Sequence, residues 1–162
     1  MPTFIQLNEA EQRLAKYLAR RRYSSNRASG VTDKKVGDQS VEQTDLLGIA
    51  GEIAVAKYLN LYPDTTISIR SGSCDLQTHN GLMIDVKTSA YHTARLTAPI
   101  TTQIYKASVY VLVVGTMPTF KIVGWAWAKD LINDGRVGDL GHGPTYVLDQ
   151  EWLEKPERLR DL

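Results

Sequence analysis

The sequence predicts a mixed α/β (α+β) fold, with a mixed central sheet and flanking helices. Three observations indicate this class. Apolar residues recur at helical spacing within the first sixty residues, alternating runs flank the Asn80-Gly81 dipeptide, and Val109–Val114 is a continuous apolar run. The order of helix, strands, crossover and further strand places a helix on a mixed sheet.

The composition suits one soluble domain. The chain has 162 residues, of which 43% are apolar and 23% charged, and this is enough to bury a core. The single cysteine, Cys74, excludes an internal disulfide. No apolar run is long enough to cross a bilayer and the first residues show no signal-peptide pattern, so we expect a cytoplasmic protein. The net charge of +1 does not by itself indicate a nucleic-acid partner.

The first expected element is a helix from about residue 9 to about residue 22, preceded by the capping-box pair Asn8 and Glu11. A long polar loop, 24–44, should follow, and loops of this length are functional or mobile. Basic residues crowd the first quarter of the chain, where they form either a footprint for nucleic-acid phosphates or a solvated helix end that runs into the polar loop. The candidates for phosphate contact are Arg20, Arg21, Arg22, Arg27, Lys34 and Lys35.

A core helix over 46–59 is expected next, with Asp45 as its N-cap. Gly48 and Gly51 lie three residues apart and would let the helix backbone approach a sheet or a ligand closely. Glu52 is the one acid in this apolar helix. It either meets a partner or points to solvent, because an isolated carboxylate is costly in apolar surroundings.

The remaining elements are strands and short turns. Trp125 and Trp127 should lie on one face of their strand, as core or interface aromatics rather than base-stacking platforms. The expected strands cover 65–70, 74–78, 82–87, 109–114, 120–128 and 145–148, with one helical turn at 130–133 and a terminal helix or turn.

The register of the hairpin around Asn80-Gly81 decides whether its acids meet. With a two-residue turn, Asp75 and Asp85 would point to opposite faces of the sheet. With a three-residue loop whose Gly81 is left-handed, Asp75 would lie opposite Asp85. The second register also keeps the apolar residues of both strands on one face, so we predict it.

Two opposed carboxylates repel each other unless a cation neutralises them. Mg²⁺ or Mn²⁺ would do so, with Glu52 completing the acidic cluster and Lys87 reaching a phosphate oxygen or the attacking water. The Asp85-x-Lys87 pair alone is a weak signal. About one acid-x-Lys match is expected by chance in such a composition, and Asp33-x-Lys35 is a second one.

In its acids, its lysine and their order, the chain resembles the PD-(D/E)XK nuclease superfamily, which has a restriction-endonuclease-like αβββαβ core. The resemblance implies that Asp75, Asp85 and Glu52 hold Mg²⁺ or Mn²⁺, that the Val86 carbonyl is a further ligand, and that Lys87 assists catalysis. It covers about residues 45 to 127, and the segments 124–126 and 146–150 look similar to small phage-borne members.

The resemblance implies one nuclease-like domain over 1–162. Its parts would be an N-terminal helix and polar loop (1–44), a catalytic core (45–128) and a C-terminal extension (129–162). The expected function is a magnesium-dependent endonuclease acting on DNA, with RNA left open, in the cytoplasm of a bacterial host if phage-borne. A homodimer is an arrangement by which such enzymes cut both strands.

Two other functions stay open. One is a catalytically silent nucleic-acid-binding or phage assembly module, and the other is a structural protein whose acids pair with Arg70 or Arg95. The RecB-like branch has tyrosine four residues after a glutamine, whereas Gln103 is followed there by Ala107. Gln103 and His92 are therefore left open as site residues. Cys74 stands where the signature has proline and is expected in the core rather than as a nucleophile.

Overall fold

The computed structural model describes residues 3–28, 30, 40–67 and 74–162. The larger sheet is formed by five strands and the smaller by three. The elements are β1 (Thr3–Gln6), α1 (Glu9–Ala28), α2 (Val41–Leu59), β2 (Leu76–Gln77), β3 (Met83–Ser89), β4 (Leu96–Pro99), β5 (Val109–Thr116), β6 (Thr119–Trp127), α3 (Ala128–Leu131), the 3₁₀ turn η1 (Asp134–Arg136), β7 (Val137–Asp139), β8 (Pro144–Leu148), η2 (Gln150–Trp152) and α4 (Pro156–Leu159).

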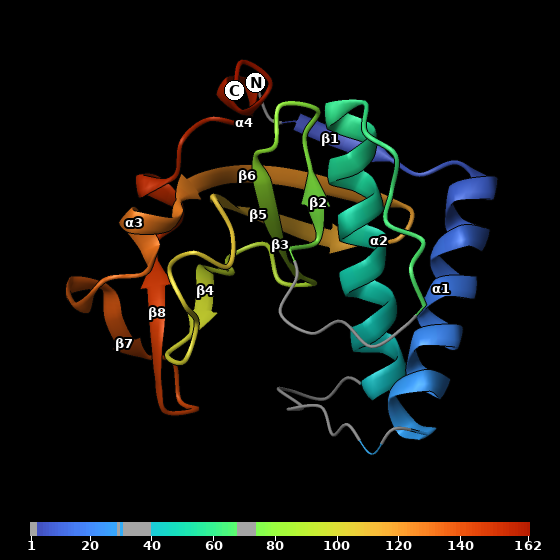
Figure 1. Cartoon of the computed structure of the whole chain (residues 1–162), viewed down its shortest axis with the longest axis horizontal. Coiled ribbons are helices and arrows are strands. Elements are labelled where there is room, and N and C mark those ends of the chain that lie inside the picture. Colours follow the sequence, from blue (N-terminus) through green and yellow to red (C-terminus); the bar gives the residue numbers. More distant parts are fainter. Residues whose placement is uncertain (1–2, 29, 31–39, 68–73) are drawn as a thin grey trace.

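The larger sheet has the strand order β1-β6-β5-β3-β2, with β3 and β5 parallel and the other pairs antiparallel. The smaller sheet has the order β4-β8-β7 and is antiparallel. Helices α1 and α2 lie on one side of the larger sheet and the smaller sheet lies on the other (Figure 1). This confirms the predicted mixed sheet with flanking helices.

Strand β5 is buried on both faces because each face of the larger sheet has its own core. Val109, Val111 and Val113 pack with the residues of α1 and α2. Tyr110 and its alternate neighbours pack instead with residues of the smaller sheet and α3. The continuous apolar run is therefore a central strand, as predicted.

The connection from β3 to the parallel strand β5 carries β4 and turns, and residues 90–108 contain no helix. An αβββαβ core would have a helix at this crossover. The structure thus supports the α+β class, while the restriction-endonuclease-like core stays a proposal.

The N-terminal helix was predicted correctly at its start and too short at its end. Asn8 and Glu11 make the reciprocal capping-box bonds, at 2.9 and 2.7 Å. The helix continues to Ala28, through residues that have no apolar stripe to predict it. The Arg27 guanidinium lies 4.9 Å from the Tyr23 ring centroid and stabilises this last part of the helix. The predicted loop 24–44 is wrong at both ends, and residues 29 and 31–39 lie outside the described residues.

Asp45 was the wrong N-cap for α2. Ser40 caps this helix in a capping box with Gln43, and α2 begins at Val41, so Asp45 lies inside it. The Ser-x-x-Gln spacing is a capping-box pattern that indicates this start. The apolar stripe begins only at Leu46, and the predicted start of the helix was placed there for that reason. The helix ends at Leu59, as expected.

The later part of the chain follows the prediction more closely. Strands β6 and β8 and the short helix α3 match their expected positions within two residues. Trp125 and Trp127 make an edge-to-face contact, with their ring centroids 5.2 Å apart, on the side of the sheet that faces α1 and α2. Strands β1, β4 and β7 were not predicted. Residues 65–67 of the expected strand 65–70 are not in a strand, and the rest lie outside the described residues.

None of the helices in the described part of the chain is both long and apolar enough to cross a membrane.

Candidate active site

The hairpin of β2 and β3 has the predicted register. Leu76 pairs with Ile84, and the Thr78 amide donates to the Leu82 carbonyl at 2.9 Å. Gly81 has a φ of +90°, which glycine adopts without strain. The three-residue loop therefore places Asp75 and Asp85 at opposite positions on the two arms of the hairpin.

Asp75 closes the edge of β3. Its amide donates to the Ile84 carbonyl at 2.9 Å, and its carboxylate Oδ2 accepts from the Val86 amide at 2.7 Å. The amide and carbonyl of an extended residue point to the same side of the strand. The Val86 carbonyl, a predicted ligand, therefore faces the edge on which the Asp75 carboxylate lies.

Asp85 is a buried acid between two lysines. It is 1% exposed and lies on the face of β3 opposite the buried side chains of Ile84 and Val86. Lys87 Nζ lies 2.5 Å from Oδ1, and Lys106 Nζ lies 3.0 Å from Oδ2. The Lys87 contact is an ion pair without hydrogen-bond geometry, and Oδ1 accepts no hydrogen bond from any described residue.

Tyr110 lies beside Asp85 in the parallel pairing of β3 and β5. The side chain is fully buried, and its hydroxyl has no hydrogen-bond partner within the described residues. Burial, together with the charges of Asp85 and Asp75, raises the pKa of Tyr110 to about 12. The phenol is therefore a protonated donor at neutral pH.

Glu52 is held by Arg22 rather than gathered with the two aspartates. The Glu52 carboxylate lies 3.5 Å from the Arg22 guanidinium, and both side chains are mostly buried. Arg22 also donates to the carbonyls of Asp64 and Thr66, at 2.7 and 2.8 Å. No three Asp, Glu, His or Cys side chains of the described chain are arranged to hold one metal ion.

The basic candidates divide into three groups. Arg20 and Arg21 are exposed on α1, and Arg27 is partly exposed against Tyr23. Arg22 is buried, and its guanidinium contacts Glu52 and two backbone carbonyls of the protein. Lys34 and Lys35 lie outside the described residues.

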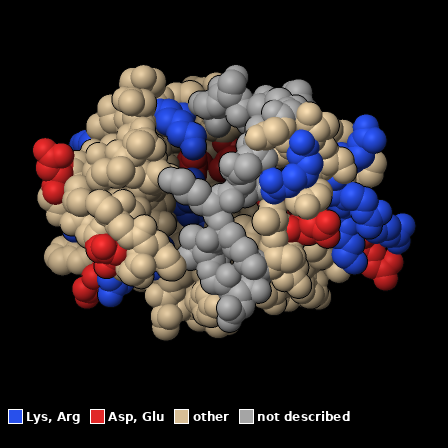
Figure 2. Space-filling model, turned by 90° about the horizontal axis from the view of Figure 1, so that it is seen from below, with Lys and Arg blue, Asp and Glu red and all other residues tan. Residues whose placement is uncertain are grey.

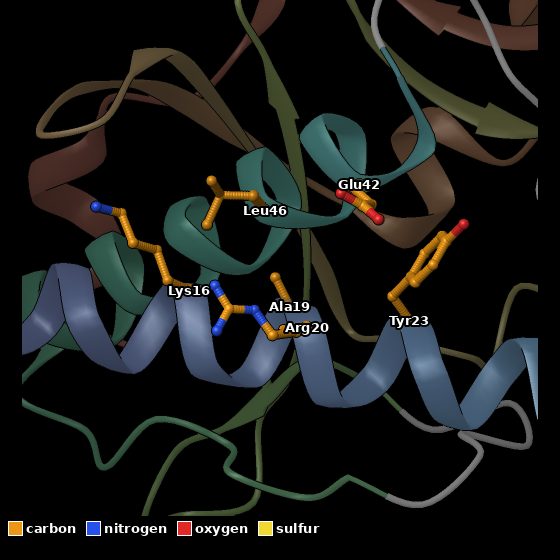
Figure 3. A pocket seen from close by; sticks show the side chains of 6 residues that line it. All are labelled: Lys16, Ala19, Arg20, Tyr23, Glu42 and Leu46. Carbon is orange, nitrogen blue, oxygen red and sulfur yellow. The ribbon is translucent and has the colours of Figure 1, made fainter.

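Arg20 lines a pocket of about 320 Å³ between α1 and α2 (Figure 3). Lys16 and Tyr23 also come from α1, whereas the Glu42 carboxylate comes from α2. The pocket therefore mixes charges of both signs and does not select an anion.

Asp75 lines a second pocket, of about 430 Å³, between the 62–65 segment and residues 74–77. On the face of the molecule that Figure 2 shows, which is not labelled by residue, acidic side chains lie deep in a hollow and basic side chains lie beside it. Cys74 lines the same pocket, and burial raises the pKa of its thiol. A thiol with a raised pKa is a poor nucleophile at neutral pH, but Cys74 is only partly buried and lies outside the hydrophobic core in which it was expected.

The two open candidates lie in different surroundings. His92 is exposed and its carbonyl accepts from Gln150. Gln103 is exposed and its carbonyl accepts from the Lys106 amide at 3.1 Å, so its backbone helps form the turn that precedes Lys106. Lys106 and Tyr110 were missed, since only the fold brings the first to Asp85. Tyr110 could have been found from the sequence, because its hydroxyl is a polar group within a strand predicted to be buried on both faces.

Comparisons with protein-family models, with curated proteins and with solved structures find no match to this chain.

The residues present fit a magnesium or manganese ion held by two carboxylates. Mg²⁺ is usually bound through one or two carboxylates and keeps several waters. Asp75 and Asp85 would supply the carboxylates, but Lys87 lies at Asp85 Oδ1 and Lys106 at Oδ2, so the ion would have to displace an ammonium group. The Val86 carbonyl adds a third oxygen at the same edge.

Proposed function

We propose that this chain is a metal-dependent phosphodiester hydrolase that acts as an endonuclease on DNA. One observation carries the proposal: the Gly81 loop brings Asp75 to the edge of β3 at Val86, next to the buried Asp85 and its ion pair with Lys87. These residues resemble the acid, acid and lysine set of the PD-(D/E)XK nucleases. The proposed cofactor is Mg²⁺ or Mn²⁺.

Asp75, Asp85 and the Val86 carbonyl would hold the ion. When bound, such an ion polarises a phosphate oxygen and lowers the pKa of a coordinated water. Lys87 would donate to the scissile phosphate and stabilise the negative charge that develops there. The Tyr110 hydroxyl, a buried donor beside both acids, would orient a water in the site. Glu52 would act outside this set, because Arg22 holds it.

The exposed arginines on α1 are the proposed contacts for DNA phosphates. Arg20, Arg21 and Arg27 remain in this role, whereas Arg22 is committed to the fold. Phosphate contacts of this kind bind without sequence preference and weaken as salt rises. Assembly as a homodimer would allow both strands of a duplex to be cut.

A catalytically silent nucleic-acid-binding or phage assembly module is the second candidate. Two lysines already neutralise Asp85, and the described residues contain no group of three metal-ligating side chains. Both facts would hold in a protein that uses the buried acid only to stabilise its fold.

Incubation of supercoiled plasmid with the protein and Mg²⁺ separates the two candidates. We expect nicking by the wild type and a loss of about 100-fold or more in Lys87→Ala, since one charge-stabilising donor contributes about that factor. Lys155→Ala is the matched control, because Lys155 is exposed and remote in sequence from the site.

Equal nicking by wild type and Lys87→Ala, or none by either, would rule out the catalytic role. Calorimetric titration with Mn²⁺ gives a second measurement, in which Asp85→Ala should abolish binding. Unchanged binding would place the metal elsewhere.

A further inference from the structure

Lys106 is a cation of the site that the sequence pattern does not mark. It lies in the connection between β4 and β5, where its Nζ is 3.0 Å from Asp85 Oδ2. Its side chain is one-third exposed, and the preceding Tyr105 is 76% exposed. The lysine therefore lies at the surface side of the buried acid, between the exposed Tyr105 and the buried Ala107.

Each oxygen of Asp85 already faces an ammonium group. Lys87 lies at Oδ1 and Lys106 at Oδ2, so two lysines neutralise the Asp85 carboxylate. A divalent ion and an ammonium group compete for the same carboxylate, because both are attracted to its negative charge. Tight metal binding therefore requires one lysine to withdraw.

The fold favours Lys106 as the lysine that withdraws. Lys87 belongs to β3, where its backbone is held by pairing with Leu112 of β5, and its Nζ lies 5.9 Å from the Tyr110 ring centroid. Lys106 is attached to a turn and reaches the acid only through its flexible side chain. A phosphodiester arriving at the site offers this side chain a new anionic partner.

We propose that Lys106 is a displaceable counter-ion of Asp85, which weakens metal binding in the free protein and moves to a substrate phosphate when nucleic acid binds. This inference rests on the proposed metal-dependent function. Metal and nucleic acid then bind with positive coupling, because the phosphate removes the cation that competes with the metal. By reciprocity, metal must raise nucleic-acid affinity by the same factor.

The test measures two affinities in Lys106→Gln. Mn²⁺ titration without nucleic acid should show metal binding that is tighter by about fivefold or more, within the usual range of such couplings. Binding of a short DNA duplex in EDTA, followed by fluorescence anisotropy, should become weaker. A purely structural role for Lys106 would not move the two affinities in opposite directions.

Two further variants serve as controls. Lys106→Arg keeps the charge and should restore both wild-type affinities, and Lys129→Gln removes an exposed lysine of α3 and should change neither. Thermal unfolding of each variant verifies that it is folded.

Suppose that the wild type binds Mn²⁺ and that Lys106→Gln binds it with the same or a lower affinity. This result would overturn the counter-ion role and leave the proposed function standing. Opposite shifts without any plasmid cleavage would support the counter-ion role and overturn hydrolysis. The absence of Mn²⁺ binding by the wild type would overturn both.

Discussion

Arg22 ties α1 to the segment that follows α2. Its guanidinium meets the Glu52 carboxylate and two backbone carbonyls, so removing it takes one donor from each of three partly buried acceptors. We expect Arg22→Ala to lower the free energy of unfolding by about 2 to 4 kcal/mol, a cost typical of a broken buried ion pair.

Arg20→Ala is the matched control on the same helix, because Arg20 is exposed. Its free energy of unfolding should stay within about 0.5 kcal/mol of the wild type. Urea denaturation measures both variants, and equal effects would contradict the assigned role of Arg22.

Tyr110 makes stability sensitive to alkaline pH. Its pKa is raised from 10.0 to about 12 in the folded protein, because burial and two nearby carboxylates oppose the phenolate. The unfolded chain therefore releases this proton first as the pH rises, and stability is lost between pH 10 and about 12.

Tyr110→Phe should remove this part of the alkaline loss. At neutral pH the variant should be as stable as the wild type or more so, because it removes a buried hydroxyl with no partner in the described structure. Urea denaturation at several pH values checks both statements. Parallel pH profiles for the two proteins would contradict the assignment.

At the level of elements, the two glycines of α2 serve different purposes. A Cβ at Gly51 would lie 1.9 Å from Thr88 Oγ1, whereas a Cβ at Gly48 would have nothing within 4 Å. The close approach predicted from the sequence is therefore confirmed at Gly51 only, where α2 packs on β3.

Alanine substitutions should separate these two positions. Gly51→Ala should destabilise the protein by about 1 to 3 kcal/mol, since α2 must shift away from β3. Gly48→Ala should stabilise it by about 0.5 to 1 kcal/mol, because alanine is the better helix former. Thermal unfolding compares them, and a loss of stability in both variants would contradict an open position at Gly48.

Elements were predictable where local rules agree with the tertiary structure. The hairpin register followed from the apolar alternation and the left-handed Gly81, and both are local properties. The start of α2 was missed because its first turn has a polar cap without an apolar stripe. Strand β4 was missed because only four residues pair, and their partner β8 lies about fifty residues further along the chain.

On the scale of the whole molecule, the sequence predicted a mixed sheet but not its two covered faces. The hydrophobic run of β5 requires cover on both sides, yet nothing local identifies the smaller sheet as the second cover. The candidate site shows the same limit. Asp75, Asp85 and Lys87 are close in sequence and were predictable, whereas Lys106 and the Arg22 partner of Glu52 depend on contacts between distant segments.

The hydrogen bond from the Val86 amide to Asp75 also covers part of a strand edge that is otherwise unpaired within the described residues. Strand β2 pairs only with Ile84 and Met83, so among the described strands the rest of β3 has no partner on that side. Unpaired strand edges are templates for intermolecular association. We therefore expect Asp75→Asn, whose amide oxygen still accepts this bond, to stay more soluble than Asp75→Ala, which leaves the Val86 amide without this acceptor.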